Sequence, residues 1–260
     1  MSRGIEVNWP KALEDRTIAI LGLGEIGSAI KECYRRNSPQ DKIIVRESGY
    51  DQFGGHQAKF LHVCIPGSLP DFNEIVLKAA RDLGGECVIV IHSTVQVGTS
   101  EKIGKSHKAT VHSPCRGIHP NLYEGLMTFV KFIGADDENA GKLASKELER
   151  IGMRCQVLKK SRTTELMKLL DTTYYSVCIA FHGYAKKLCD GEKLDFDEVM
   201  TLANDTYDEG YFSLGMPQVI RPVLTPPTGP LGGHCCIPNA KLLKEKFGPD
   251  PIIKMVLDWS

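Results

Sequence analysis

The feature that most constrains this chain is a glycine-rich run near its start, Gly22-Leu23-Gly24-Glu25-Ile26-Gly27. The run matches the pattern G-x-G-x-x-G and follows a short apolar stretch, Thr17 to Leu21, that predicts a buried strand. Apolar residues then recur at helical spacing, so the glycines lie in the turn from a strand into a helix. Such a turn lets a pyrophosphate approach the backbone and meet the free N–H groups of the helix. The sequence therefore predicts a dinucleotide-binding loop made of Gly22, Gly24, Glu25, Ile26 and Gly27.

The residues that end the next apolar run bear on the choice of cofactor. Glu47 lies about 20 positions beyond the loop, where an acidic side chain bonds the ribose hydroxyls of NAD. Arg46 precedes it, and an arginine at this place can instead accept the 2′-phosphate of NADP. We expect NAD as the cofactor, with Arg46 as the argument for NADP.

Short apolar runs alternate with helical segments over the first part of the chain. The expected helices are 71–83, 99–106 and 138–151, and the expected strands are 17–21, 42–45, 60–65, 86–91, 109–112, 128–133 and 155–158. Strands that alternate with helices favour a parallel sheet covered on both faces. The fold class that this predicts is α/β, with a Rossmann-type doubly wound parallel sheet.

Beyond Lys160 the pattern becomes helical, which predicts a dinucleotide-binding domain over 1–160 and a smaller all-helical substrate and dimerisation domain over 161–260. Helices are expected at 165–188, 195–203 and 240–247, and the proline-rich stretch 217–230 is expected to be irregular. Ser161, Thr163 and Thr164 are candidate N-caps of the first of these helices, supported by Glu165. Apolar positions surround that helix, so we expect a homodimer formed through it.

Composition narrows the classes of partner and compartment. Lysine plus arginine and aspartate plus glutamate both number 32, so no net charge favours nucleic acid or an acidic membrane surface. The apolar runs are too short to span a bilayer. The nine cysteines are odd in number and scattered, and no secretory signal precedes them, so we expect reduced thiols in a cytoplasmic protein. The partner expected is a small-molecule substrate.

Five segments together resemble the UDP-glucose/GDP-mannose dehydrogenase family, within the 6-phosphogluconate-dehydrogenase-like superfamily. They occur in the family's order and span most of the chain. The segments are Leu21 to Gly27, His62-Val63-Cys64-Ile65-Pro66, His92-Ser93-Thr94-Val95-Gln96-Val97-Gly98-Thr99, Thr164-Glu165-Leu166-Met167-Lys168-Leu169 and Gly232-Gly233-His234-Cys235.

The resemblance implies an enzyme that oxidises a primary alcohol of a nucleotide sugar with NAD. It implies that Cys235 is the nucleophile that traps the aldehyde as a thiohemiacetal, that Lys168 stabilises the oxyanion, and that Thr94 positions a water molecule. It also assigns Glu124 to the family's catalytic carboxylate. By the same resemblance Pro66, Ser93 and Thr94 belong to the cofactor site. These roles suit the chemistry, since an ammonium group stabilises both a thiolate and a developing oxyanion.

The chain departs from the family's pattern at several positions. The family's aspartate four residues after the nucleophile is Asn239, and its glutamate after Ser-Pro is Cys115. Its asparagine in the long helix is Thr172, and its later Asn-Glu pair is His182-Gly183. The family's C-terminal nucleotide-sugar domain is also absent, so we expect a short form. Two alternatives therefore stay open: a simpler two-electron dehydrogenase or reductase that acts on another small substrate, and a non-catalytic dinucleotide-binding protein.

Each candidate side chain also has a purely structural interpretation. Cys235 can be a buried thiol, Lys168 a solvated charge on a helix, Thr94 a turn residue, and Glu124 a carboxylate in the first turn of a helix. His112, Cys115 and His119 have spacings that would suit zinc, with His234, Cys235 and Cys236 as further ligands. Because the chain contains no Cys-x-x-Cys pair, we expect no metal.

Overall fold

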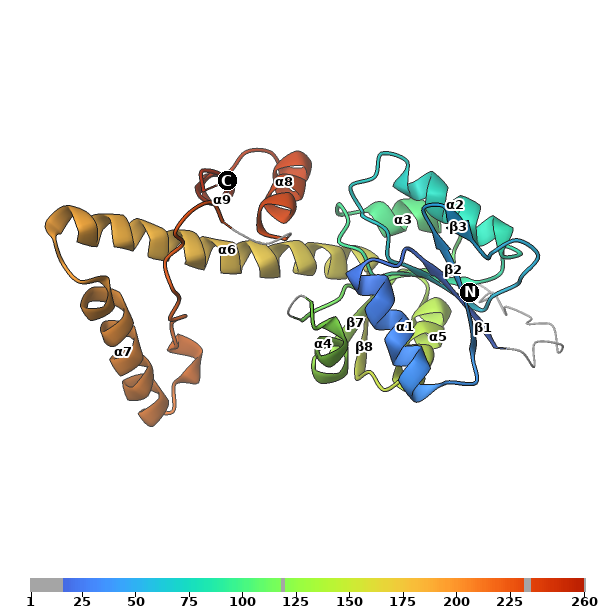
Figure 1. Ribbon diagram of the computed structural model, residues 1–260, viewed down its shortest axis with the longest axis horizontal. Coiled ribbons are helices and arrows are strands. Elements are labelled where there is room, and N and C mark those ends of the chain that lie inside the picture. The colour runs from blue at the N-terminus through green and yellow to red at the C-terminus, as the bar shows by residue number, and fades with distance from the viewer. Residues whose placement is uncertain (1–15, 118–119, 232–234, 260) are drawn as a thin grey trace. The chain divides into compact units, whose positions relative to one another are not determined.

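The computed structural model describes residues 16–117, 120–231 and 235–259. By their internal contacts the residues form two compact units, Met1–Lys168 and Leu169–Ser260. The helices and strands of both units are drawn in Figure 1. None of the helices in the described ranges has the length and apolar character needed to cross a membrane.

The first unit contains an eight-stranded sheet with the strand order β3-β2-β1-β4-β5-β6-β7-β8. The strands are β1 (Thr17–Leu21), β2 (Lys42–Glu47), β3 (Tyr50–Asp51), β4 (Phe60–Val63), β5 (Val88–Ile91), β6 (Thr110–His112), β7 (Lys131–Ala135) and β8 (Cys155–Leu158). Strands β2, β1, β4, β5 and β6 are parallel. The order turns back between β1 and β4, and ligands of doubly wound sheets bind beside such a reversal, at the carboxyl ends of the strands.

Helices cover both faces of this sheet. On one face lie α1 (Glu25–Asn37), α4 (Leu122–Thr128) and α5 (Glu138–Arg150), and on the other α2 (Phe72–Asp82) and α3 (Thr99–Gly104) (Figure 1). Side chains alternate along each strand, so Ile18 and Ile20 of β1 pack into one core while Ala19 and Leu21 pack into the other. The whole of β1 is therefore buried, which explains its continuous apolar sequence.

The structure confirms the Rossmann-type sheet and corrects its details. The sheet is mixed, because β7 runs antiparallel to β6 and β3 antiparallel to β2. The strand expected at 128–133 begins only at Lys131, because α4 extends to Thr128. Within α4, Gly125 fits closely against the backbone of Arg116 and Gly117. The two-residue strand β3 was not expected from the sequence.

The helix expected at 165–188 is longer at both ends and forms α6 (Ser161–Glu192). Its expected capping residues have other tasks. Thr164 lies 2.8 Å from Nδ1 of His112 through its hydroxyl, and the Glu165 carboxylate accepts hydrogen bonds from the N–H groups of Gly98 and Ser100. Ser161 is the first helical residue and bonds to Asp136. The first turns of α6 thus attach to the sheet and to α3.

Among the residues that the structure describes, the regular elements of the second unit are all helices, with an irregular stretch between Val219 and Cys236. The unit contains the rest of α6, α7 (Leu202–Ser213), α8 (Cys236–Phe247) and α9 (Pro251–Leu257). The helix expected at 195–203 is instead a π-helical turn, Asp197–Thr201, that continues into α7. A short 3-10 turn, Pro217–Val219, opens the proline-rich stretch, and α9 was not expected.

Candidate functional site

The glycine loop joins β1 to α1, and its three glycines differ in what surrounds them. Gly22 has φ +94°, and a Cβ there would lie 2.9 Å from Cγ2 of Ile65. A Cβ at Gly27 would lie 1.9 Å from the carbonyl oxygen of Gly22. A Cβ at Gly24 would meet nothing within 4 Å. The first and third glycines are therefore required by packing, whereas Gly24 faces open space.

The start of α1 follows directly on the glycine loop. Gly24 is the N-cap residue and gives no side-chain cap to the helix. Glu25 and Ile26 form the first helical positions, with Glu25 exposed and Ile26 half-buried. The first N–H groups of a helix can hold the phosphates of a dinucleotide.

Glu47 ends β2 beside this loop. Its Oε2 accepts a hydrogen bond of 2.5 Å from the N–H of Leu23, and its Oε1 accepts one of 2.9 Å from Ser48. These two bonds lower the pKa of Glu47, because they stabilise the ionised carboxylate. The structure thus places an ionised hydrogen-bond acceptor next to the glycine loop.

Arg46 is engaged within the protein. Its guanidinium forms ion pairs with Asp51 of β3 at 2.9 Å and with Asp82 of α2 at 2.8 Å, and it lies 4.5 Å from the ring centre of Phe53. Neighbouring residues of a strand point to opposite faces, so Arg46 and Glu47 are directed apart. Because two carboxylates offset the positive charge of this arginine, it would attract a 2′-phosphate only weakly.

The loops after β4 and β5 are in contact at the same edge of the sheet. Ser93 is buried and donates a hydrogen bond of 2.6 Å to the carbonyl of Ile65, directly before the exposed Pro66. A Cβ at Gly67 would lie 2.1 Å from the carbonyl oxygen of Thr94. Because Gly22 packs against Ile65, the structure brings three separate segments together beside the carboxyl ends of β1 and β4.

Lys168 belongs to the same unit as Thr94. It lies on α6, one turn after Glu165, and is half-buried. Burial lowers the pKa of His112 to about 3, and the positive charges of Lys131 and Lys168 act in the same direction. Lys168 therefore lies near His112, whose Nε2 is 3.1 Å from the carbonyl oxygen of Ser93.

Glu124 and Cys115 lie on the face of the sheet that α1 covers. Glu124 is an exposed carboxylate in the first turn of α4. Cys115 is buried, with its Sγ 3.3 Å from the Nζ of Lys131, which also donates to the carbonyls of Ser113 and Pro114. The position that is glutamate in the resembled family thus holds a buried thiol beside an ammonium group.

Cys235 belongs to the second unit. It is half-buried and is the N-cap residue of α8, and its carbonyl accepts a hydrogen bond from the N–H of Asn239 at 3.0 Å. Cys236 and Asn239 are buried, and within the described part of the chain the Asn239 amide nitrogen has no partner. Gly232, Gly233, His234 and His119 lie outside the described residues. Among the residues that the structure describes, no three His, Cys, Asp or Glu side chains lie close enough together to hold a metal ion.

A buried polar chain that the sequence interpretation missed crosses the first unit. The Tyr34 hydroxyl donates to Glu147 at 2.9 Å and lies 2.8 Å from Nε2 of His62. Nδ1 of His62 lies 2.9 Å from Nε2 of His92, whose own Nδ1 lies 2.9 Å from the carbonyl oxygen of Ser113. In the sequence, the sign of this buried polar network is the single histidine within or directly after an apolar run.

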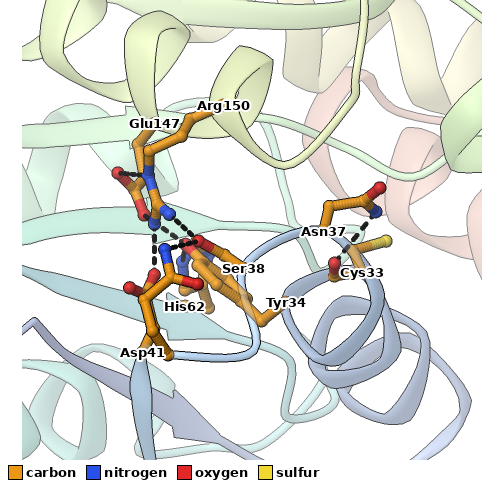
Figure 2. Close-up of polar contacts among 9 residues, drawn as sticks. Cys33, Tyr34, Asn37, Ser38, Asp41, His62, Glu147 and Arg150 are labelled. Atoms are coloured by element: carbon orange, nitrogen blue, oxygen red, sulfur yellow. Dashed lines mark hydrogen bonds and ion pairs between the residues drawn. The ribbon is translucent and has the colours of Figure 1, made fainter.

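The outer end of this chain is an ionic cluster between α1 and α5. Figure 2 shows the Arg150 guanidinium between Glu147 on its own helix and Ser38 and Asp41 from the turn that precedes β2. Asp41 and Glu147 are both buried, and one arginine serves both carboxylates. The cluster ties α5 to the turn between α1 and β2, away from the glycine loop.

The chain is similar to curated proteins over part of their length. It is 28% identical to a UDP-N-acetyl-D-mannosamine dehydrogenase of Methanocaldococcus jannaschii over 164 residues, which cover 61% of this chain and 35% of that protein. It is 26% identical to the protein of the same name from Pyrococcus horikoshii over 203 residues, 71% of this chain and 45% of that protein. The chain therefore spans less than half the length of these relatives. No family profile matches it.

Solved structures share the fold. A UDP-D-ManNAc dehydrogenase from Pyrococcus horikoshii superimposes with a TM-score of 0.69 at 21% identity, over 94% of this chain and 68% of that one. A UDP-glucose dehydrogenase from Pyrobaculum islandicum gives 0.69 at 18% identity, over 96% and 69%. A 3-hydroxyisobutyrate dehydrogenase from Mycobacterium tuberculosis gives 0.65 at 16% identity, over 94% and 92%. The chain is thus similar in sequence to nucleotide-sugar dehydrogenases over part of their length, and it shares its fold with these solved structures.

Proposed function

We propose that this protein is an NAD-dependent oxidoreductase that acts on an alcohol. The observation that carries the proposal is the glycine loop, where Gly22 and Gly27 are fixed by packing while Gly24, the N-cap residue of α1, faces open space. A loop of this shape offers backbone N–H groups to a pyrophosphate. Named relatives that are dehydrogenases support the same class of reaction.

We propose NAD rather than NADP as the cofactor. The Glu47 carboxylate is ionised beside the loop, where it would accept hydrogen bonds from ribose hydroxyls and repel a 2′-phosphate. Arg46, the residue that would favour NADP, is already paired with Asp51 and Asp82.

We propose that oxidation proceeds through a thiohemiacetal on Cys235, an assignment that rests on the family resemblance. When bound, the nicotinamide would accept a hydride from the carbinol carbon of the substrate, while the hydroxyl proton is released to water and an aldehyde is left. The Cys235 thiolate would then attack the carbonyl carbon of the aldehyde, forming a C–S bond while the C=O electron pair moves to oxygen. Lys168 would stabilise that oxyanion through its ammonium group, Thr94 would position a water molecule near the cofactor, and Glu124 is the candidate carboxylate.

The substrate that the relatives suggest is a nucleotide sugar, since those in the comparison are named for UDP-N-acetyl-D-mannosamine. Asn239 favours a second candidate, a two-electron oxidation of a different small alcohol. This residue is buried four positions after Cys235, and an amide cannot take a proton from the water that would hydrolyse a thioester. A protein that binds NAD without turnover is the third candidate.

The first test is a titration of the protein with NADH, followed by cofactor fluorescence and calorimetry. Gly24→Asp should abolish saturable NADH binding, because the new carboxylate would repel the pyrophosphate. The protein should stay folded, since a Cβ at this position has no atom within 4 Å. Lys31→Asp, an exposed change on the same helix, is the matched control and should bind normally. If the wild-type protein fails to bind either NADH or NADPH, the proposal is wrong. Turnover is then sought by screening UDP-sugars and simple alcohols for reduction of NAD.

A further inference from the structure

We propose that the first unit carries a second ligand site at the amino-terminal ends of its parallel strands. This site is a pocket for a small organic anion with an apolar body. The pocket has a volume of about 300 Å³. Its walls come from the starts of β1 and β4 and from the second half of α5. The glycine loop and the loops after β4 and β5 lie at the carboxyl ends of the strands, so this pocket is separate from the cofactor site.

The charge of the pocket points to an anion. Its lining includes four cationic side chains, Arg16, Lys59, Lys146 and Arg150, and one carboxylate, Glu147. Arg150 is neutralised by Asp41 and Glu147. Within the described ranges, the ion pairs include none formed by Arg16, Lys59 or Lys146. Three cations that converge on one cavity repel one another, and a bound anion removes that repulsion.

The stability of α5 explains part of this arrangement but not all of it. Cations near the C-terminal end of a helix interact favourably with its dipole, which accounts for Lys146 and Arg150 on α5. Arg16 and Lys59 come from the starts of two strands and gain nothing from that dipole. Their presence on the same cavity is the feature that a ligand explains.

The floor of the pocket selects the body of the ligand. Ile18, Phe60 and Leu143 supply apolar surface to the same pocket that the cations line. A bare inorganic anion would leave this floor uncovered, whereas a carboxylate on a short hydrocarbon would cover it and pair with the lysines. The chemistry that fits is therefore a small amphiphilic carboxylate.

The test measures binding of octanoate to the full-length protein by calorimetry, with 1-octanol and sulfate as partial ligands. We expect octanoate to bind and both partial ligands to bind at least about tenfold more weakly, because each lacks one half of the recognition. Octanol that binds as well as octanoate would show an apolar site without anion selectivity. Sulfate that binds equally well would show that the apolar floor is not used. Either result, or no octanoate binding, overturns the proposal.

Matched variants locate the site. Lys59→Gln/Lys146→Gln should weaken octanoate binding by about tenfold or more, because two charge-assisted contacts are lost. Lys108→Gln/Lys142→Gln removes the same charge from exposed positions outside the pocket and should leave affinity unchanged. Equal affinity in the first variant and the wild type would refute the site.

Competition with the cofactor separates this proposal from the dehydrogenase proposal. Octanoate affinity should be the same with and without saturating NADH, because the two sites lie at opposite edges of the sheet. Displacement of octanoate by NADH would assign it to the dinucleotide site and overturn the proposal. If NADH itself does not bind, the octanoate measurements with the lysine variants still decide whether the anion site exists.

Discussion

At the scale of single residues, the three loop glycines separate what folding requires from what a ligand requires. A methyl group at Gly27 would overlap the carbonyl of Gly22, and one at Gly22 would meet Ile65 in a backbone conformation that disfavours side chains. Gly24 has open space around it. A glycine that packing does not need, at the N-cap of α1, is consistent with our proposal that a ligand approaches the backbone closely there.

Glu47 supports a prediction about cofactor choice. We expect the wild-type protein to bind NADH at least about tenfold more tightly than NADPH, since the ionised carboxylate repels a 2′-phosphate. Glu47→Gln removes the charge but keeps a hydrogen-bond acceptor, so it should narrow this ratio mainly by improving NADPH binding. Fluorescence titration of both cofactors measures it. An unchanged ratio would mean that Glu47 does not contact the ribose.

Cys235 supports a prediction about reactivity. Brief treatment with iodoacetamide at neutral pH, followed by mass spectrometry, should label Cys235 before the other cysteines. Six of those are buried, including Cys236, and burial raises the pKa of half-buried Cys155 to about 11, which suppresses its thiolate. The remaining half-buried thiol, Cys178, serves as the internal comparison.

The partnership of Cys235 with Lys168 is tested in the same assay. Lys168→Ala should slow the labelling of Cys235, because the ammonium group is proposed to act beside the thiolate. An unchanged rate would leave Lys168 a structural residue. If Cys236 or Cys115 is labelled first, the nucleophile is misassigned. If Cys235→Ser keeps full turnover, covalent catalysis is excluded and the two-electron candidate is favoured.

At the scale of elements, the buried histidines connect strands and helices of the first unit. His62 of β4 bonds to Tyr34 of α1, and His92, next after β5, bonds to His62 and to the carbonyl of Ser113. Glu147 of α5 completes the chain through Tyr34. Buried polar groups need all their hydrogen-bond partners, so this series of hydrogen bonds fixes how α1 and α5 pack against the strands.

These histidines predict that the protein is sensitive to acid. Burial lowers the pKa of His62 and of His112 to about 3 and that of His92 well below its ordinary value, so all three are neutral when folded. In the unfolded chain they would take up protons below about pH 6.5, so the unfolded state binds more protons between pH 3 and 6.5. As the pH is lowered through this window, the free energy of unfolding should therefore decrease, by up to about 1.4 kcal/mol per pH unit for each histidine.

Urea unfolding at pH 7.5, 6.0 and 5.0 measures this dependence. His92→Gln removes one of the three titrating groups and should make the slope shallower, whatever its effect on stability at neutral pH. A free energy of unfolding that stays constant from pH 7.5 to 5.0 would contradict the prediction that these histidines are neutral.

At the scale of the whole molecule, the second unit exposes many large apolar side chains. Large apolar side chains about half exposed or more are spaced along α6 and α7, namely Leu170, Tyr174, Tyr175, Phe181, Tyr184, Leu188, Leu202, Tyr207 and Phe212. Where such side chains form a contiguous patch, they commonly mark an interface between proteins. Self-association through α6 remains our proposal for what covers them.

Sedimentation velocity tests this proposal. The wild-type protein should sediment as a dimer at micromolar concentration, and Leu170→Lys/Tyr174→Lys should shift it to monomer, because both side chains are more than half exposed on α6. Lys241→Glu, an exposed charge change on α8, should leave the dimer intact. A monomeric wild-type protein would refute self-association.

The sequence alone determined the class of fold and the glycine loop, because both depend on local patterns. Thr17 to Leu21 is apolar at every position, and the spacing of the three glycines that follow is a property of one short turn. The family resemblance likewise rests on short segments that can be read in order along the chain.

Only the tertiary structure decided the direction of β7, the partners of Arg46 and the role of Glu165. Periodicity shows that a strand is present but not which neighbour it pairs with, so a parallel β7 was expected and an antiparallel one is found. In the sequence Arg46 is a candidate ligand for a 2′-phosphate, whereas in the structure Asp51 and Asp82, from two other elements, pair with it. Glu165 looked like a cap for its own helix, yet it accepts the N–H groups of Gly98 and Ser100, far away along the chain. A charged side chain takes its partner from whatever the fold brings near it, and that choice is made by three-dimensional packing rather than by neighbours in sequence.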